Sequence, residues 1–381
     1  MEIKQWKDVL HIVSGKNQKA VENPNGKYPI YGSGGLMGYA DDYLCEAGTT
    51  IVGRKGTINR PIFVTKPFWN IDTAFGIAPD KGLVPKYLYY FCVHFNFMPL
   101  DKSTGRPSLA KSDLLKIEMP VPPLPEQERI VARIEELFSQ LDAGVETLKK
   151  TKAQLAVYRQ AVLKEAFEGR LTASGPEKIV RLGDYIETPR YGTSKKCSYD
   201  DGRDRTAVYR IPNIEHKNGR ISHDDIKYAQ FTESELDGIR LRQGDILIIR
   251  SNGSVSLVGR AAMVCDADIT GTFAGYLMRL RISEPETLLP KFLLLFLQSH
   301  QARIYIENKA KSTSGVHNIN STEISDLQMP LYDPDTQYAI IEAIESRLSV
   351  CDSIEHTVDL ALQQAEAMRQ SILKDAFEGR L

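Results

Sequence analysis

The chain contains one stretch of sequence twice, and this repeat constrains the fold more than any other feature. Residues 159–171 (RQAVLKEAFEGRL) and 369–381 (RQSILKDAFEGRL) lie 210 positions apart and are identical at ten of thirteen positions. The same offset continues upstream without a gap and aligns Gln127 with Gln337. A repeat of this length predicts two copies of one structural unit, each ending in the same segment.

Farther upstream, the two copies differ more. The offset falls to 205 at residues 84–91 (VPKYLYYF) and 289–296 (LPKFLLLF), and to 196 at residues 48–54 (GTTIVGR) and 244–250 (GDILIIR). Insertions have therefore accumulated in the first part of each copy, while the last part has changed little. Duplication alone does not explain this difference, which favours a common structural helix joined to a variable recognition segment.

The last part of each copy is predicted to be one long helix. A proline-rich break at residues 120–125 (PVPPLP) precedes 43 residues without proline, Glu126 to Glu168, which correspond to roughly 65 Å of helix. Gly169 and Gly379 stand where a C-terminal cap is expected. Heptad spacing predicts an interface formed by Ile134, Leu141, Leu148 and Leu155 in the first helix and by Ile344, Ile354, Val358 and Met368 in the second.

Two arrangements of these helices are compatible with the heptads. Each helix could pack on its own globular segment, or the two helices could pair with each other. Each apolar seam is imperfect alone, with Gly144 and Thr151 in the first copy and Arg347 in the second. The chain must also return through a whole globular segment between the helices. Both observations favour an antiparallel pair that holds two globular segments apart.

The globular segments are predicted to be mixed, with short strands dominant and helices packed on them. TTIVG, PIFV, DILIIR and YLMRLRI are β-rich runs bounded by Gly, Pro or Asn, and YLYYFCVHF and KFLLLFLQSHQARIYI are typical of helices. The predicted fold class is therefore α+β. We expect globular domains at residues 1–122 and 172–332, and long helices at residues 123–171 and 333–381.

The composition is that of a soluble globular protein, with 42% hydrophobic and 25% charged residues. No apolar run is long enough to span a membrane, the first residues do not resemble a cleavable leader, and the five cysteines form no C-x-x-C pair. These features predict a cytoplasmic protein without a disulfide framework or a structural zinc site. The net charge is −1, but residues 1–124 carry +4 and residues 334–381 carry −5, so positive charge collects in the first segment.

The sequence contains no recognisable catalytic set. It has no G-x-x-x-x-G-K-[ST] phosphate loop, no N-P-P-[YF] or D-P-P-[YF] tetrapeptide of amino-methyltransferases, and no histidine pair at metal-ligand spacing. The glycine-rich residues 31–38 (YGSGGLMG) favour a turn over a dinucleotide site. We therefore expect no catalytic residue, metal or cofactor in this chain, and we expect a binding or scaffolding protein.

Polar, basic loops at matching positions of both copies favour DNA binding. An arginine at the end of a strand can place its guanidinium on a guanine, while hydroxyls and backbone N–H groups bind phosphate. A single loop of this kind is more often a solvated turn. Because such loops occur at matching positions of both copies, the interpretation of the whole set as DNA-binding is strengthened. The candidate DNA-binding residues are Arg54, Lys55, Lys102, Ser103, Thr104 and Arg106 in the first segment, and Tyr191, Thr193, Lys195, Lys196, Arg250, Ser251, Asn252, Ser254, Lys309, Lys311 and Ser312 in the second.

These features together resemble the specificity subunits of type I restriction-modification systems. The matching segments are residues 123–138 (PLPEQERIVARIEELF), the two AFEGRL endings, LGDY at residues 182–185, YGSGGLMGY at residues 31–39, and GTTIVGRKGTINRPIF at residues 48–63. The resemblance covers essentially the whole chain and is most specific in the predicted helices.

The resemblance implies a chain without catalytic activity of its own. Each globular segment would be a mixed α/β target-recognition domain that reads one half of a split double-stranded DNA target. The two helices would form an antiparallel coiled coil, set the spacing of the half-sites and dock two methyltransferase (modification) subunits, which would bring S-adenosylmethionine. Restriction subunits, with ATP- and Mg-dependent translocation and cleavage, would join the larger complex.

The second helix departs from the family pattern at its start, where Asp335-Thr336-Gln337 stands in place of Pro125-Glu126-Gln127. This difference leaves Gln337 as the one clear match and bears on whether two partners dock symmetrically. Two alternatives remain open: the recognition subunit of a smaller methylation-only or combined restriction–methylation system, and a coiled-coil scaffold whose globular segments bind protein.

Overall fold

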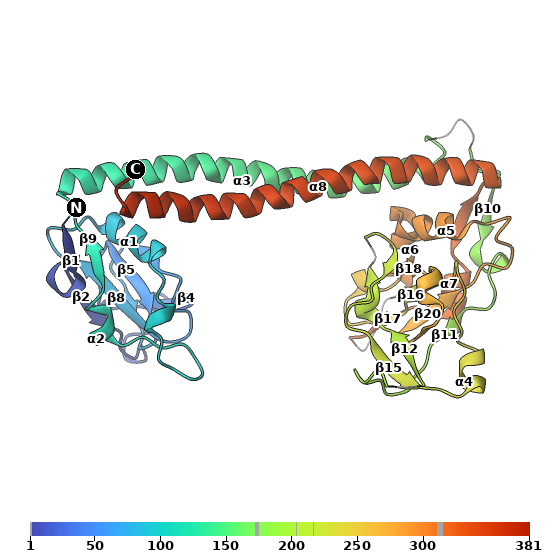
Figure 1. The fold of residues 1–381 in the computed structure, drawn as a ribbon, viewed down its shortest axis with the longest axis horizontal. Helices are drawn as coiled ribbons and strands as arrows, with labels where there is room; N and C mark the ends of the chain where they lie inside the picture. The colour runs from blue at the N-terminus through green and yellow to red at the C-terminus, as the bar shows by residue number, and fades with distance from the viewer. Residues whose placement is uncertain (1, 172–174, 203, 216, 311–314) are drawn as a thin grey trace. The chain divides into compact units, whose positions relative to one another are not determined.

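The computed structural model describes residues 2–171, 175–202, 204–215, 217–310 and 315–381, which form a mixture of helices and sheets (Figure 1). The chain divides into two compact units. Unit 1 comprises Met1–Lys150 and Val358–Leu381, and unit 2 comprises Thr151–Thr357. The boundary crosses both long helices, α3 (Leu124–Phe167) and α8 (Pro334–Phe377), so each unit contains one globular segment and part of each long helix.

The globular segment of unit 1 contains two main sheets. The antiparallel four-stranded sheet has the order β2 (Leu10–Ser14), β8 (Ala74–Pro79), β5 (Thr49–Gly53), β6 (Ile62–Val64). The three-stranded sheet has the order β4 (Gly35–Ala40), β3 (Tyr28–Gly32), β7 (Trp69–Asn70), and β3 and β7 are parallel. A further pair, β1 (Ile3–Gln5) with β9 (Glu118–Pro120), closes the segment just before α3, and the shorter α-helices are α1 (Pro85–His94) and α2 (Lys111–Leu114).

The globular segment of unit 2 repeats this topology. Its antiparallel four-stranded sheet has the order β11 (Arg190–Tyr191), β20 (Leu277–Leu280), β16 (Ile246–Ile249), β18 (Ala261–Met263). Its three-stranded sheet has the order β15 (Lys227–Gln230), β12 (Arg205–Tyr209), β19 (Thr272–Phe273), again with one parallel pair, β12 with β19. The pair β10 (Lys178–Arg181) with β22 (Gln328–Leu331) stands just before α8. Strand order and pairing direction therefore agree between the two segments that differ most in sequence.

Unit 2 has further short helices and strand pairs. The α-helices of its globular segment are α4 (Glu233–Asp237), α5 (Pro290–Gln298), α6 (His300–Lys309) and α7 (Ser321–Ser325). Two more strand pairs are β13 (Ile214–Glu215) with β14 (Arg220–Ile221), and β17 (Ser251–Asn252) with β21 (His317–Asn318). The 3-10 turns of the described residues are Trp6–Asp8 and Met98–Leu100 in unit 1, and Leu182–Asp184, Ile211–Asn213, Val255–Leu257 and Asp266–Asp268 in unit 2. The helices predicted from YLYYFCVHF and KFLLLFLQSHQARIYI are confirmed as α1 and as α5 with α6.

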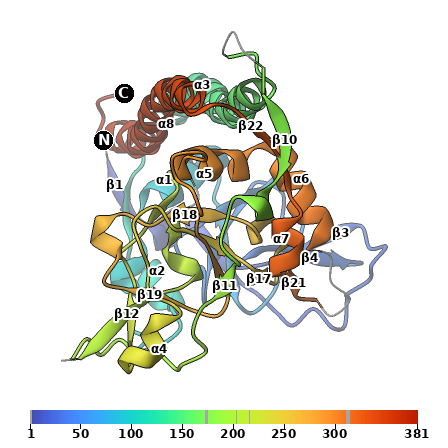
Figure 2. The ribbon, with the colours of Figure 1, turned by 90° about the vertical axis from the view of Figure 1, so that its right-hand side faces the viewer.

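The end of each long helix fills the core beside the other copy's globular segment. In unit 1, Phe377 at the end of α8 packs edge-on against Tyr87 and Phe91 of α1, with ring centroids 5.2 and 5.4 Å apart. In unit 2, Phe167 at the end of α3 packs against two phenylalanines of α5 in the same way, both at 5.2 Å. Figure 2 shows the ribbon of α5 next to the long helices. The repeated AFEGRL segment is therefore a core segment that completes the globular segment of the opposite copy.

Glycine ends both long helices, as the sequence predicts. Gly169 and Gly379 have φ of 75° and 77°, in the left-handed region that favours glycine. The next residue, Arg170 or Arg380, donates its N–H to the carbonyl five positions earlier, at 2.9 and 2.8 Å. This is the geometry of a Schellman cap, so each helix stops directly after its buried phenylalanine.

The two long helices run in opposite directions within each unit. In unit 1, Arg369 of α8 pairs with Asp142 of α3. In unit 2, Arg159 of α3 pairs with Asp352 of α8. These are the same two positions of the repeat, because 142 aligns with 352 and 159 with 369. One arginine–aspartate contact between the helices therefore occurs once in each unit.

The residues predicted for the helix interface differ in burial. Ile134 and Ile344 are fully buried, and Val358 is 5% exposed. Three further predicted residues are half-buried: Leu141, Leu148 and Leu155. Ile354 and Met368 are 41% and 54% exposed, so their prediction as interface residues is wrong. An α-helix with 3.6 residues per turn drifts by about 20° per heptad, and this drift brings one of two heptad series to the outer surface of a nearly straight helix.

A buried glutamine fixes the start of each long helix. Gln127 accepts the N–H of Val84 at 2.8 Å, and its Nε2 donates to the carbonyls of Gly82 and Pro122 at 3.0 and 2.8 Å. Gln337 makes the three equivalent bonds, to the N–H of Leu289 at 2.9 Å and to the carbonyls of Thr287 and Tyr332 at 2.8 Å each. Both side chains are fully buried. The different residues that precede these glutamines therefore leave the helix starts alike.

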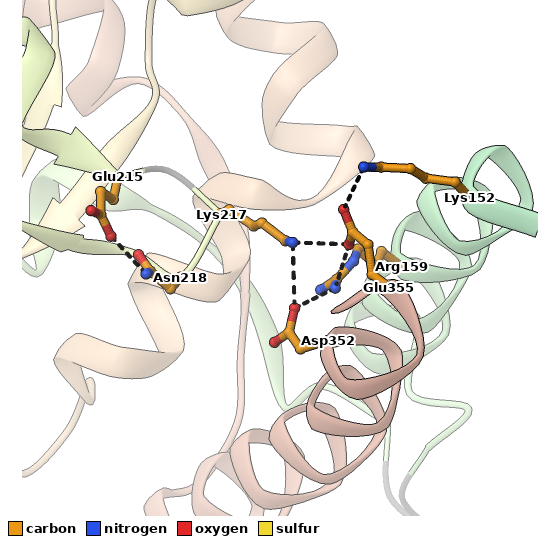
Figure 3. Close-up of polar contacts among 7 residues, drawn as sticks. All are labelled: Lys152, Arg159, Glu215, Lys217, Asn218, Asp352 and Glu355. Carbon is orange, nitrogen blue, oxygen red and sulfur yellow. Dashed lines mark hydrogen bonds and ion pairs between the residues drawn. The ribbon is translucent and has the colours of Figure 1, made fainter. Parts of the chain in front are cut away.

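Unit 2 has an ion-pair network that joins its globular segment to both long helices (Figure 3). Lys217, between β13 and β14, lies 2.9 Å from Glu355 and 3.8 Å from Asp352 of α8. Arg159 of α3 contacts both carboxylates, and Lys152 lies 4.0 Å from Glu355. Hydrogen bonding to Lys217 is the largest of the effects that lower the pKa of Glu355. The network therefore ties a hairpin of the globular segment to the helix pair.

Candidate nucleic-acid interface

Arg54 follows β5 directly and is held by neighbouring backbone. Its N–H donates to the carbonyl of Thr73 at 2.8 Å, and its carbonyl accepts the N–H of Leu109 at 2.8 Å. Its Nη1 donates to the carbonyl of Asp72 at 3.4 Å, and its guanidinium lies 5.7 Å from the ring centroid of Phe75. Both ends of this residue are therefore positioned by contacts within unit 1.

A pocket of about 600 Å³ opens beside Arg54. Its lining residues are Ser14, Arg54, Phe75, Lys102, Ser103, Ser108, Leu109, Ala110 and Lys111. Lys102 lies 2.7 Å from Asp113 and is the main cause of the lowered pKa of that carboxyl, and Lys111 donates to the carbonyl of Ile12 at 2.7 Å. Arg54 forms no ion pair among the described residues, and no Asp or Glu lines this unit 1 pocket.

The two predicted loops of unit 1 lie beside each other. Lys55 forms a β-bridge with Ser108, and the guanidinium of Arg106 lies over Gly56, where a Cβ would be only 2.7 Å from it. Arg54, Lys102 and Ser103 therefore line the pocket, while Lys55 and Arg106 lie on the loops that border it. Thr104 is exposed on the second loop.

Arg250 of unit 2 has the contacts of Arg54. It follows β16, its N–H donates to the carbonyl of Tyr276 at 2.9 Å, and its carbonyl accepts the N–H of Ile319 at 2.9 Å. Its Nη1 donates to the carbonyl of Gly275 at 3.2 Å. Its guanidinium lies over the ring of Tyr191, 4.1 Å from the centroid. The predicted residues Tyr191 and Arg250, far apart in sequence, are therefore brought into contact.

A second pocket, of about 720 Å³, opens beside Arg250. Its lining residues are Tyr191, Gly192, Thr193, Ser194, Lys195, Cys197, Arg210, Ile211, Pro212, Lys227, Arg250, Ser251, Ala274, Gly275 and Tyr276. Lys195 lies 2.7 Å from Glu235 and is the main reason that the pKa of that carboxyl falls to about 2. Four cationic side chains line this unit 2 pocket, and no Asp or Glu does so within the part of the chain that the structure describes.

Two of these cations, Arg210 and Lys227, are absent from the sequence prediction. Arg210 follows β12 as Arg250 follows β16, so the same strand-end pattern in TAVYR would have found it. Lys227 begins β15, and only the pairing of β15 with β12 places it at the pocket. The Nε atoms of Arg210 and Arg250 are buried and have no hydrogen-bond partner among the residues described.

Other predicted residues of unit 2 lie outside the pocket. Asn252 belongs to β17 and accepts the N–H of Ser254 at 2.9 Å. Lys196 is exposed and Lys309 ends α6, 5.8 Å from the ring centroid of Tyr305. Lys311 and Ser312 lie outside the described residues. The structure therefore brings the predicted residues Tyr191, Thr193, Lys195, Arg250 and Ser251 together at the pocket. The other predicted residues of unit 2 lie at the edge of the pocket or outside it.

The described residues include no group of three His, Cys, Asp or Glu side chains arranged to hold a metal ion. None of the helices within the described ranges is both long and apolar enough to cross a membrane.

Comparisons with known proteins agree with these observations. The family model of the type I restriction modification DNA specificity domain matches residues 1–156. The type I restriction enzyme StySPI specificity subunit of Salmonella potsdam is 26% identical over 346 residues, which cover 86% of this chain and 73% of that protein. The EcoKI specificity subunit of Escherichia coli (strain K12) is 30% identical over 281 residues, 71% of this chain and 59% of that protein.

A solved structure also has this fold. A chain from work on the complex assembly and conformational transition of the type I R-M system matches with a TM-score of 0.78 at 16% identity, covering 100% of this chain and 98% of that one. At this identity the likeness concerns the fold alone. The family model and the curated relatives concern the sequence itself: residues 1–156 belong to the family of type I restriction modification DNA specificity domains, and the chain is similar over most of its length to type I restriction enzyme specificity subunits.

Proposed function

We propose that this chain is a non-catalytic recognition subunit whose two globular domains, residues 1–122 and 172–332, each read one half of a bipartite double-stranded DNA target. The observation that carries the proposal is the pair of equivalent pockets. Each has an arginine after the corresponding strand of the same sheet, and no acidic residue among those that line it. A lining with several cationic side chains and no acidic one attracts the phosphate backbone of DNA.

The long helices, residues 123–171 and 333–381, set the gap between the half-sites and dock methyltransferase subunits. In support, each unit contains part of both helices and the same arginine–aspartate contact between them. Two equivalent units favour two methyltransferase subunits, which bring S-adenosylmethionine. Restriction subunits, with ATP and Mg, join a larger complex that acts on DNA in the cytoplasm.

Methylome sequencing of cells that express this chain with its methyltransferase partner tests the proposal. We expect new methylation at a bipartite, asymmetric sequence with an unread gap. A matched chain in which residues 1–122 come from a relative should change one half-site and keep the other. A continuous target, or an unaltered methylome in cells that contain the assembled complex, would contradict the proposal.

DNA binding at increasing salt separates recognition from scaffolding. Phosphate contacts release counterions, so affinity should fall steeply between 50 and 200 mM salt. Retention that does not depend on salt would favour a scaffold whose domains bind protein. Cleavage of unmodified DNA by the purified complex, with ATP, would separate a full restriction system from one that only methylates.

A further inference from the structure

The two arginine sites agree in more detail than the sequence around them. In each, the backbone N–H and the Nη1 of the arginine donate to the carbonyls of two consecutive residues. These are Thr73 and Asp72 for Arg54, and Tyr276 and Gly275 for Arg250. In each, the carbonyl of the arginine accepts an N–H from the residue two positions before a short helix, α2 or α7. The surrounding domains have acquired insertions, yet the position of the arginine has not changed.

The ring under each guanidinium comes from a different strand. Ser14 of β2 pairs with Phe75 of β8, and the equivalent pair is Tyr191 of β11 with Met278 of β20. The aromatic residue therefore stands on one strand in unit 1 and on its neighbour in unit 2. The arginine lies over the ring in both cases, at 5.7 and 4.1 Å from the centroid. A contact that both copies make with different residues indicates that the orientation of the guanidinium matters.

A guanidinium fixed in this way suits the edge of a base. Stacking on a ring fixes its plane, and one backbone bond at Nη1 leaves further N–H donors free. Guanine offers two acceptors, O6 and N7, in the major groove, and a planar arginine fork binds both at once. Phosphates accept hydrogen bonds from many directions, and lysines line both pockets to meet them. The fixed arginines therefore fit base reading better than phosphate binding.

We propose that Arg54 and Arg250 each bind the major-groove edge of a guanine, and that these two guanines stand at the same offset from the methylated base of their half-sites. The equal offset follows from the equal placement of the two arginines within units of one topology. This inference rests on the proposed function, because it requires each globular domain to read one half-site.

The experiment compares Arg54→Lys and Arg250→Lys in the assembled complex by methylome sequencing. Lysine keeps the charge and loses the fork. Each variant should accept other base pairs at one position of one half-site, with discrimination there reduced by about 5- to 100-fold. The two relaxed positions should have the same offset and should both be guanine in the original target. Arg220→Lys, the same change at an exposed arginine of β14 outside both pockets, is the control and should relax no position.

Selection of bound duplexes from a randomised pool by the purified complex repeats the measurement without methylation, and thermal melting checks that each variant is folded. Uniform weakening over all sequences would make the arginines phosphate contacts and would overturn the inference. Relaxed positions at unequal offsets, or at bases other than guanine, would also overturn it. If the unaltered chain had no bipartite target, this result would instead contradict the proposed function itself.

Discussion

At the start of each long helix, one glutamine side chain satisfies a backbone N–H and two carbonyls that are otherwise enclosed by the fold. A buried polar group without a partner costs about 1–3 kcal/mol, so a side chain that serves three such groups is difficult to replace. The buried hydrogen bonds within each unit therefore explain why both copies have a glutamine at this position, Gln127 and Gln337. Their retention in both copies carries no information about how partner proteins dock.

Replacing Gln337 with Leu should destabilise unit 2 by about 2–4 kcal/mol, because three hydrogen bonds are lost and their backbone partners stay buried. Hydrogen exchange of the Leu289 amide should accelerate, while the amide of Val84 in unit 1 should be unaffected. The matched variant Gln127→Leu should show the opposite pattern. Unchanged exchange at both amides in both variants would mean that the glutamines do not support the helix starts.

Some residues of the candidate site can be predicted from the sequence next to them, and others depend on contacts between distant parts of the chain. Arg54 and Arg250 are recognisable because a strand-end arginine recurs at equivalent positions of the repeat. The contact of Arg250 with Tyr191 joins residues 59 positions apart, through strands whose pairing no local pattern specifies. Lys227 reaches the pocket only through the pairing of β15 with β12. Local chemistry could be predicted from sequence, and its assembly into a pocket could not.

Among the elements, the β13–β14 hairpin of unit 2 is held to the helix pair by charge. Lys217 is about half exposed, whereas the side chain of Glu355 is 19% exposed, so the contact is partly shielded from water. Lysine hydrogen bonding lowers the pKa of Glu355 in the folded chain. A carboxyl with a lowered folded-state pKa stabilises the fold above its unfolded value, and this contribution is lost as pH falls through the folded value.

We therefore expect Lys217→Gln to lower the melting temperature of the chain slightly at pH 7, by the equivalent of about 1 kcal/mol or less. The difference between wild type and variant should shrink as pH falls below the ordinary glutamate pKa of 4.5, and it should also shrink in 1 M salt. Lys196→Gln, an exposed lysine outside the network, provides the matched control. A difference that is constant from pH 7 to pH 3 would show that charge does not hold the hairpin.

The long helices were predictable as elements, and their exposed faces were not. The proline-rich break defines where the first helix starts, and the absence of proline and the capping glycines define how far both helices extend. Ile134 and Ile344 of the heptad pattern are buried, each in a core cluster that includes residues of a globular segment and of the other long helix. Ile354 and Met368 follow the same spacing in the sequence but rotate outward, since spacing alone does not specify how far a helix supercoils.

On the scale of the whole molecule, the repeat was visible in the helices and hidden in the globular segments. Strand order and pairing in the two segments agree although few residues align, because a sheet requires a pattern of apolar and polar positions more than particular residues. The insertions that obscured the alignment include the β13–β14 hairpin, which has no counterpart in unit 1 among the described residues. Two copies of a duplicated fold can therefore keep the same topology after few of their residues still align.

Removing one heptad from each long helix tests their proposed role in spacing. Deletion of residues 144–150 and 354–360 together removes equivalent heptads from the two copies and keeps the facing arginine–aspartate contacts. The gap in the DNA target should shorten by roughly three base pairs, because seven residues of helix span about 10 Å and each base pair about 3.4 Å. Methylome sequencing reads both quantities, and altered half-sites with an unchanged gap would contradict the spacing role.

The packing of Phe377 against α1 has a consequence for the order in which the chain matures during synthesis. The core of unit 1 includes Leu373, Ala376 and Phe377, which a ribosome adds only after the whole second globular segment. At ordinary translation rates, the nascent first domain waits roughly 10–50 s for the segment that covers its apolar surface. A chain that terminates early thus leaves that surface open to aggregation or to proteolysis, whichever comes first, even though every residue of its first globular segment is present.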